Sequence, residues 1–337
     1  MCQFCTKHGE GKKWYLQMSN YSRELLSEEL PAQTQEMAGA QTRLQWLEGF
    51  VRGFVMPAIT GRPPAQQAAG AAGGAAAEQP QTPPPTAEDI LAERQAVHFG
   101  QVLPVEDVEQ VIDQVDSVTR MPCGCRFMST GKADKRYCFG LGVDCRGILG
   151  KFPEASSSLE VLEKEEAKQV IRDYDEEGLV HSIWTGVTPY VIGVCNCDRD
   201  CMAYKGYIEQ RGLPHFFRAE YVGQVDWDQC TGCKSCVSQC QFGAEFYSSA
   251  LGKVFIDPTR CFGCGACRAA CAHDAITLVP RQQHPEAADL WLGPATKTLC
   301  VDRRRGQGRA RPRPTVSLSP FPSSVEGRKA RARGRHK

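Results

Sequence analysis

The sequence predicts an α+β protein in which a mixed α/β, cysteine-rich middle domain precedes a compact C-terminal cysteine domain. Three observations support this prediction. A four-cysteine pattern occurs twice between residues 230 and 271. Helix-like and strand-like hydrophobic periodicities alternate between residues 105 and 194. Two segments of biased composition, one rich in Ala, Gly and Pro and one rich in Arg and Pro, carry too few large apolar side chains to form a core.

These observations divide the 337 residues into five segments. We expect an N-terminal segment with cysteines, aromatic residues and a helix at 1–60, followed by a disordered Ala/Gly/Pro linker at 61–86. A cysteine-rich middle domain with a metal site is expected at 87–218. The repeated cysteine pattern forms a domain at 219–280, and a basic disordered tail occupies 281–337.

The expected helices and strands follow from hydrophobic periodicity. A helix is expected over 105–118, because five aliphatic residues fall on one face, and a second over 164–177. Gly178 fits the left-handed cap that ends a helix. Two strand-like runs follow at 179–184 and 190–194.

The most apolar helical segment is 44–59, and it is interrupted by Glu48, Arg52 and Pro57. No stretch of the sequence reaches the length of an uninterrupted transmembrane helix. The segment therefore favours a core or docking helix, and we expect no membrane insertion.

Eight cysteines form two runs with the spacing C-x2-C-x2-C-x3-C, offset by 31 residues. The runs are Cys230, Cys233, Cys236 and Cys240, and then Cys261, Cys264, Cys267 and Cys271. Gly232 and Gly263 recur at the same position of each run, where the backbone must turn tightly. Each half reads as a strand, a cysteine loop, a helical turn and a second strand.

The segment 219–280 resembles the two-cluster bacterial-type ferredoxin domain. The resemblance implies two [4Fe–4S] clusters, each held by three cysteines of one run and the fourth cysteine of the other. One cluster then takes Cys230, Cys233, Cys236 and Cys271, and the other takes Cys261, Cys264, Cys267 and Cys240. The family usually has proline after the fourth cysteine, where Gln241 and Ala272 stand here. Two zinc sites are the alternative, but zinc sites normally pair cysteines across a longer gap.

Seven more cysteines lie in the expected middle domain, several of them in close pairs: Cys123, Cys125, Cys138, Cys145, Cys195, Cys197 and Cys201. Each C-x-C pair follows an expected element. Two such loops brought together would supply enough sulfur for a third iron–sulfur cluster or a zinc site. We expect the ligands among Cys123, Cys125, Cys195, Cys197 and Cys201, with Cys138 and Cys145 as alternates. Ordinary buried thiols are the other interpretation.

The N-terminus offers Cys2, Cys5 and His8 at a spacing that could supply up to three ligands. Such a half-site needs partners from elsewhere, for example Cys138 or Cys145. A mobile terminus with free thiols is the alternative, and the sequence leaves both open.

Beyond the repeat, the chain resembles a group of largely uncharacterised iron–sulfur proteins of anaerobic bacteria. The shared marks are Cys2 to Cys5 with the run 9–16, and the segments 98–101, 123–126, 178–181 and 195–198. The resemblance covers most of 1–280. It implies an iron–sulfur redox protein and supplies no substrate.

The cysteine content and the charge distribution bear on the cellular compartment and on the partners of the protein. The chain holds 18 cysteines without a basic and apolar secretory signal before them, so we expect a reducing cytoplasm. Residues 303–337 carry 12 Lys and Arg and one acid, Glu326, which leaves about −10 for the rest of the chain. The tail could be read as a nucleic-acid arm, but no aromatic residue is interleaved among its arginines, so we expect no nucleic acid partner.

The predicted function is that of an iron–sulfur electron-transfer protein or oxidoreductase subunit. It would carry single electrons through two [4Fe–4S] clusters to or from a cytoplasmic redox partner protein. A redox or metal sensor whose middle-domain cluster controls partner binding is the alternative. No nicotinamide or flavin motif stands in the right context, so an electron carrier is expected rather than an enzyme with its own substrate site.

Overall fold

The computed structural model describes one compact unit, within residues 1–297. The described residues are 5, 9, 13–32, 35–36, 39–62, 86, 89, 100–142, 151–204 and 216–292. The expected linker (except residues 61, 62 and 86) and the tail beyond residue 292 therefore lie outside the described residues. No described helix has the length and apolar character needed to cross a membrane.

The N-terminal part of the chain is helical. Short 3-10 turns, η1 (Trp14–Leu16) and η2 (Met18–Tyr21), and a single turn, α2 (Glu24–Ser27), come first. The helix expected over 44–59 is present as three successive helical elements: α4 (Arg43–Phe50), the π-type η3 (Val51–Val55) and α5 (Met56–Thr60). Pro57 stands in the first turn of α5 and directly follows the π-type turn, in which the Met56 N–H donates to the Val51 carbonyl.

The centre of the fold is a six-stranded antiparallel sheet with the order β1-β5-β6-β3-β2-β4. Its strands are β1 (Gly100–Leu103), β2 (Val118–Met121), β3 (Cys138–Leu141), β4 (Glu160–Leu162), β5 (Val180–Thr185) and β6 (Val191–Cys197). Helices α8 (Val105–Gln114), α9 (Gly124–Thr130) and α11 (Lys164–Glu176) connect them, with a 3-10 turn η4 (Pro153–Ser158).

Two sequence-based boundaries differ from the structure. The helix expected to reach Val118 ends at Gln114, because Val115 is already extended and Val118 begins the buried strand β2. The strand expected to end at Val194 continues to Cys197. The second C-x-C pair therefore lies within β6, with both cysteines on the same face of the strand.

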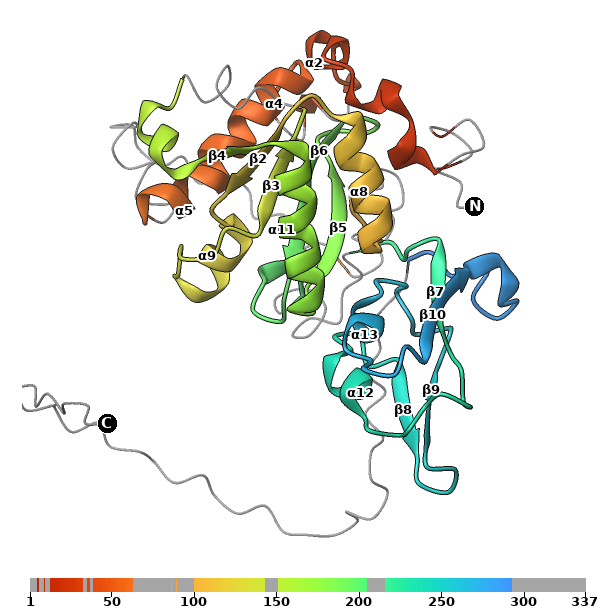
Figure 1. Cartoon of the computed structure of the whole chain (residues 1–337). Helices are drawn as coiled ribbons and strands as arrows, with labels where there is room; N and C mark the ends of the chain where they lie inside the picture. Colours follow the sequence, from red (N-terminus) through yellow and green to blue (C-terminus); the bar gives the residue numbers. More distant parts are fainter. Residues whose placement is uncertain are drawn as a thin grey trace, which may run out of the picture. The chain divides into compact units, whose positions relative to one another are not determined.

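The sheet is covered on both faces. Helices α8 and α11 lie side by side against one face (Figure 1) and bury their aliphatic stripes against Phe139, Ile183 and Val194. On the other face, the helical segment 43–60 packs its apolar side chains near Met121 and Ile192. The middle part of the chain is therefore a three-layer unit of helix, sheet and helix.

The C-terminal module repeats one unit twice. Strand β7 (Tyr221–Val225), helix α12 (Ser235–Gln239) and strand β8 (Glu245–Ser248) form the first repeat. Strand β9 (Lys253–Ile256), helix α13 (Ala266–Ala269) and strand β10 (Ile276–Pro280) form the second. The strands pair across the repeats, β7 with β10 and β8 with β9, both antiparallel (Figure 1). The two repeats are thus interlocked rather than arranged in series.

Gly232 and Gly263 are equivalent in the two repeats. Their φ angles are +70° and +71°, in the left-handed region that favours glycine. A Cβ at Gly232 would stand 2.1 Å from the Gly252 carbonyl oxygen, and one at Gly263 would stand 2.2 Å from that of Tyr221. Each cysteine loop therefore packs directly on the backbone of a neighbouring segment.

The ordered chain continues past the expected start of the tail at residue 281. A 3-10 turn, η6 (Arg281–Gln283), follows β10 directly. The Arg281 side chain is fully buried, and the Arg218 amide donates to the Trp291 carbonyl at 2.8 Å. Residues 281–292 therefore belong to the folded module.

A buried polar cluster joins the N-terminal segment, α8 and β7. The Asp107 carboxylate accepts hydrogen bonds from Lys13 at 2.8 Å, from the Tyr15 hydroxyl at 2.7 Å and from the Tyr221 hydroxyl at 3.2 Å. Lys13 also lies over the Tyr221 ring. Burial alone would lower the pKa of Lys13, but its hydrogen bonds to Asp107 and Tyr221 raise it. Three distant parts of the sequence therefore depend on one carboxylate.

We expect Asp107→Ala to lower the free energy of unfolding by about 3 kcal/mol, because it leaves a partly buried ammonium and two hydroxyls without their acceptor. Since the pKa of Lys13 is raised in the folded state, this stabilisation is fully present below the ordinary lysine pKa of about 10.4 and declines above it. Urea unfolding at neutral pH and at pH 11 measures both effects. Glu109→Ala, on the same helix, is the matched control: it removes only a solvent-accessible ion pair with Arg172 and should change the midpoint much less. Equal effects of the two substitutions would contradict the role given to Asp107.

Candidate functional site

The first group of four cysteines, ligand set I, lies in the C-terminal module: Cys230, Cys233, Cys236 and Cys271. All four line one cavity of about 20 Å³. The first three come from the loop after β7 and from α12, whereas Cys271 follows α13 of the other repeat. The interlocked repeats therefore bring Cys271 to the cysteines of the other run. This is the grouping that the resemblance implied.

The second group, ligand set II, consists of Cys240, Cys261, Cys264 and Cys267. Cys240 follows α12, and its charge interacts with that of Cys264 in the second repeat. Backbone amides point at its sulfurs: Gly223 and Gly263 donate to the Cys261 Sγ at 3.4 and 3.3 Å, and Ala244 donates to the Cys240 Sγ at 3.3 Å. N–H···S hydrogen bonds favour thiolates, the form that binds iron.

The two sets differ in exposure. Cys233 is exposed, and the backbone N–H of Ser235 lowers its pKa. Burial instead raises the pKa of Cys264 to about 12 and that of Cys267 well above its ordinary value. A metal that binds these thiols would have to displace their protons, so its binding would weaken as the pH falls.

Charged side chains gather around set II. Arg281 donates to the carbonyls of Ala219, Tyr221 and Cys261 at 2.8 to 3.0 Å, and burial lowers its pKa to about 10. Arg218 is also buried and lies over the Phe262 ring. These two guanidinium groups offset the negative charge that four thiolates bring to the site. A cationic setting of this kind fits an anionic iron–sulfur cube.

One acid opposes these cations. Glu245 is buried at the start of β8, beside Cys240 and Cys267, and desolvation raises its pKa. The raised pKa makes this carboxyl group easier to protonate, which reduces the negative charge that it would add to the site. Neither Glu245 nor Arg281 could be assigned to the site from the sequence, because no motif marks them.

A further six cysteines, the middle cysteine group, meet at one end of the central strands β3 and β6: Cys123, Cys125, Cys138, Cys195, Cys197 and Cys201. Cys138 on β3 is the direct cross-strand partner of Cys195 on β6. Cys197 lies two residues further along β6, on the same face. The loop and first turn of α9 supply two more thiols, and Cys201 comes from the turn after β6.

The thiols of this group neighbour one another. Cys123 interacts with Cys138 and Cys201, and Cys195 interacts with Cys138 and Cys197. For every member, another thiol of the group has a larger effect on the pKa than burial does. Hydrogen bonds from Cys195 and Cys201 lower the pKa of Cys197 to about 6. In set II, by contrast, burial is the largest cause for each thiol.

An ion pair connects the two C-x-C segments. Arg126 directly follows Cys125 and pairs with Asp198, which directly follows Cys197. Both partners are part of motifs that are visible in the sequence, but the sequence does not show that they meet. The pair holds the α9 loop against the end of β6.

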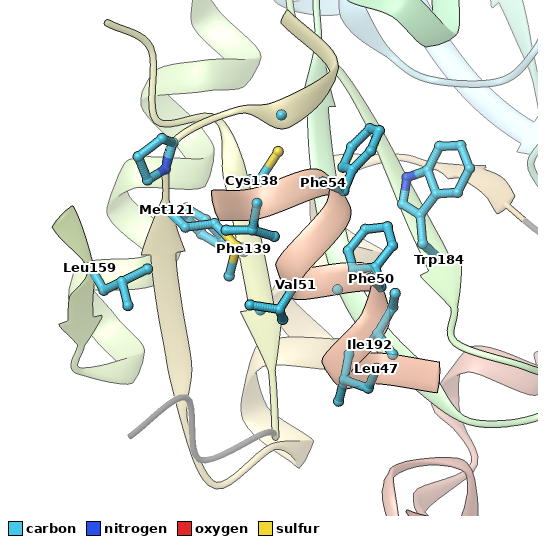
Figure 2. Close-up of a pocket in the computed structure, with 15 residues that line it drawn as sticks. Leu47, Phe50, Val51, Phe54, Met121, Cys138, Phe139, Leu159, Trp184 and Ile192 are labelled. Carbon is cyan, nitrogen blue, oxygen red and sulfur yellow. The ribbon is translucent and has the colours of Figure 1, made fainter. Parts of the chain in front are cut away.

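An apolar cavity of about 90 Å³ borders the middle cysteine group. Figure 2 shows Met121 and Leu159 on one side, Trp184 on the other, and Cys138 between them near Phe54. Among the residues that the structure describes, none that lines this cavity is charged. Phe54 also packs on Gly124, where an added Cβ would lie 2.5 Å from the Phe54 carbonyl oxygen. The cavity therefore keeps one side of the group in apolar surroundings.

The remaining expected ligands are Cys2, Cys5, His8 and Cys145, and the described part of the chain brings none of them to these groups. Cys5 is buried, and its thiol donates to Glu220 at 3.1 Å. Cys2, His8 and Cys145 lie outside the described residues. Across the part of the chain that the structure describes, no three Cys, His, Asp or Glu side chains form a preformed site for a single metal ion.

Comparisons with known proteins concern the C-terminal module. The sequence model of the 4Fe-4S dicluster domain family matches residues 229–276. The archaeal-type glutamate synthase (NADPH) of Thermotoga maritima is 39% identical over 59 residues, which is 18% of this chain and 12% of that protein. Indolepyruvate oxidoreductase subunit IorA is 30% identical over 108 residues in Thermococcus kodakarensis and 28% over 111 in Pyrococcus abyssi. These two matches cover 32% and 33% of this chain and 16% of each relative.

The chain thus spans between 12% and 16% of the length of these curated relatives. Most of each relative therefore has no counterpart in this chain. Both ligand sets fall within the range that the family covers, 229–276. The chain is therefore a mixed helix-and-sheet protein that contains a C-terminal 4Fe-4S dicluster domain.

Proposed function

We propose that this protein carries single electrons through two [4Fe–4S] clusters to or from a separate oxidoreductase in a reducing cytoplasm. Sets I and II would hold the clusters, and each cube supplies a one-electron redox couple. The observation that carries the proposal is the interlocked grouping of Cys271 with Cys230, Cys233 and Cys236 around one cavity. A pair of independent zinc loops would not exchange their fourth cysteines in this way.

The surroundings of the two sets support different roles for them. The exposed Cys233 gives set I an edge on the surface, where a partner protein can approach. None of the cysteines of set II is exposed, and the partly buried Cys240 and Cys264 pack against the apolar cluster that contains Cys197 and Cys201. Electrons would therefore be exchanged with a partner at set I and with the interior of this chain at set II.

The relatives support a role alongside an oxidoreductase. Two of the relatives that match part of this chain are, by name, a glutamate synthase and an indolepyruvate oxidoreductase subunit. Because the shared part is a small fraction of each, the substrates in those names are not assigned to this chain. We propose an electron carrier or subunit that works with a partner enzyme. A third, iron–sulfur site would extend the electron path, whereas a zinc ion, which has no redox chemistry, would make the middle domain a structural platform.

The test is anaerobic purification of the full chain with iron, sulfide and zinc analysis, followed by EPR of the reduced protein. At least about eight iron and eight sulfide per chain, with signals of two reducible [4Fe–4S] clusters, are expected. Zinc without sulfide would contradict the proposal. A change of oligomeric state on oxidation, with no electron exchange with a low-potential donor, would favour the redox sensor instead.

A further inference from the structure

The middle cysteine group has more thiols in mutual contact than an apolar core would require. A buried cysteine normally behaves as a small hydrophobe and packs against aliphatic side chains. Cys5 shows the contrast within this chain, because its single buried thiol is satisfied by Glu220. Here six thiols neighbour one another instead. They come from the start of α9 (Cys123 and Cys125), from β3 (Cys138), from β6 (Cys195 and Cys197) and from the turn after it (Cys201).

We propose that the middle cysteine group binds a third cofactor, an iron–sulfur cluster, and that this cluster exchanges electrons with the cluster of set II. Four of the six thiols suffice to hold a four-iron cube. Cys138 and Cys201 belong to the candidate ligands on equal terms with the two C-x-C pairs. The second half of the proposal rests on the function proposed above, whereas the cluster itself does not.

The donor atoms select the kind of cofactor. All six are sulfur, and thiolate donors favour zinc, copper(I) and iron–sulfur clusters over harder ions. Backbone amides already donate hydrogen bonds to these sulfurs: the backbone N–H of Arg126 to Cys123, and that of Gly124 to Cys138. The same kind of N–H···S bond surrounds set II, inside the 4Fe-4S dicluster domain. The middle group therefore repeats the local chemistry of the iron–sulfur module.

The site is organised by the fold itself. The register of β3 and β6 fixes Cys138 beside Cys195, and the Arg126–Asp198 pair fixes the α9 loop beside Cys197. The buried Arg126 guanidinium, held in place by its ion pair with Asp198, puts a positive charge next to the two C-x-C segments. A fixed positive charge compensates part of the negative charge of bound thiolates.

The surroundings favour a redox cluster over a structural zinc ion. The apolar cavity of about 90 Å³ shields the Cys138 side, and low exposure is one of the factors that set a cluster potential. On another side the group adjoins set II. Tyr204 and the stacked pair Phe242 and Phe262 lie in the apolar cluster that Cys197 shares with Cys240 and Cys264.

Direct hydrogen bonds join the two cysteine groups. The Gln241 amide donates to the Cys197 carbonyl at 3.0 Å, and Gln241 directly follows Cys240 in the chain. In the opposite direction, Arg199 donates to the Cys240 carbonyl at 2.9 Å. Two short reciprocal connections therefore run between a ligand of set II and the end of β6. An electron leaving a reduced cluster at one group would be accepted by the oxidised cluster at the other.

The first experiment counts iron, sulfide and zinc in the full-length protein purified without oxygen. We expect about twelve iron and twelve sulfide per chain, against about eight for sets I and II alone. The double variant Cys125→Ala with Cys197→Ala should fall to about eight iron, and the matched control Cys5→Ala should keep about twelve. Single Cys→Ala variants at all six positions then identify the four ligands.

The outcomes separate this inference from the proposed function. About eight iron in the wild type, unchanged in the double variant, would overturn the third cluster and leave the proposed function intact. Zinc at the middle group would overturn it as well. If the wild type holds about four iron, all lost in the double variant, the third cluster stands and the two-cluster function fails.

A second experiment tests the connection. EPR relaxation of the middle cluster should be faster in the reduced wild type than in Cys261→Ala, where the cluster of set II is lost. The comparison uses one full-length background, so it does not depend on activity. Equal relaxation rates in the two proteins would overturn the electronic link.

Discussion

Cys271→Ala is expected to abolish the cluster of set I and to leave the cluster of set II in place. The variant should lose about four of the eight iron atoms assigned to the dicluster domain. The reason is the geometry of the cavity, in which Cys271 faces Cys230, Cys233 and Cys236 rather than the cysteines of its own run. Iron analysis and EPR of the reduced variant measure the loss.

Cys240→Ala is the reciprocal control, and it should remove the cluster of set II instead. Each substitution removes a terminal cysteine of a run, so the two variants differ mainly in which cube loses a ligand. If Cys271→Ala removed the signal of the cluster held by Cys261, Cys264 and Cys267, the crossed assignment would be wrong.

Arg281→Met should have the second largest effect, on both stability and potential. The side chain is fully buried and donates to three backbone carbonyls, so its loss leaves three buried acceptors without a donor. We expect a loss of about 3 kcal/mol in the free energy of unfolding. Removing a positive charge close to Cys261 should also lower the potential of the cluster of set II, on the order of 100 mV.

Arg281→Lys separates the two effects of the substitution. It keeps the charge but cannot reproduce the planar set of donors, so it should lose stability while its potential stays closer to that of the wild type. Redox titration followed by EPR gives the potential, and anaerobic urea unfolding gives the stability. An unchanged potential of set II in Arg281→Met would contradict the electrostatic role of Arg281.

The iron–sulfur module could be predicted from the sequence because its signal is local and occurs twice. Only two residues separate each of the first three cysteines of a run from the next, and Gly232 and Gly263 mark the same tight turn in both repeats. The helices over 105–114 and 164–176 can be predicted equally well, since their apolar residues repeat with helical spacing. The end of the first helix is harder to predict, because Val115 and Val118 fit a helix face and a strand equally well.

Long-range features of the site could not be read in this way. Cys138 is isolated in the sequence and joins the middle cysteine group only because β3 pairs with β6. Arg126 and Asp198 each look like an ordinary polar residue after a cysteine pair, and their contact depends on the folded sheet. Arg281 was assigned to a basic tail on composition, although tertiary packing buries it completely.

The buried cluster around Asp107 has a consequence for the order of events on the ribosome. Lys13 and Tyr221 are separated by 208 residues, yet both contact the same carboxylate. At roughly 5–20 residues per second, Lys13 waits about 10–40 s after its synthesis before Tyr221 exists to meet it. During that interval the N-terminal segment can reach Asp107 but not β7. Completion of this cluster, and with it the attachment of β7 to the N-terminal segment, therefore cannot occur before Tyr221 has been made.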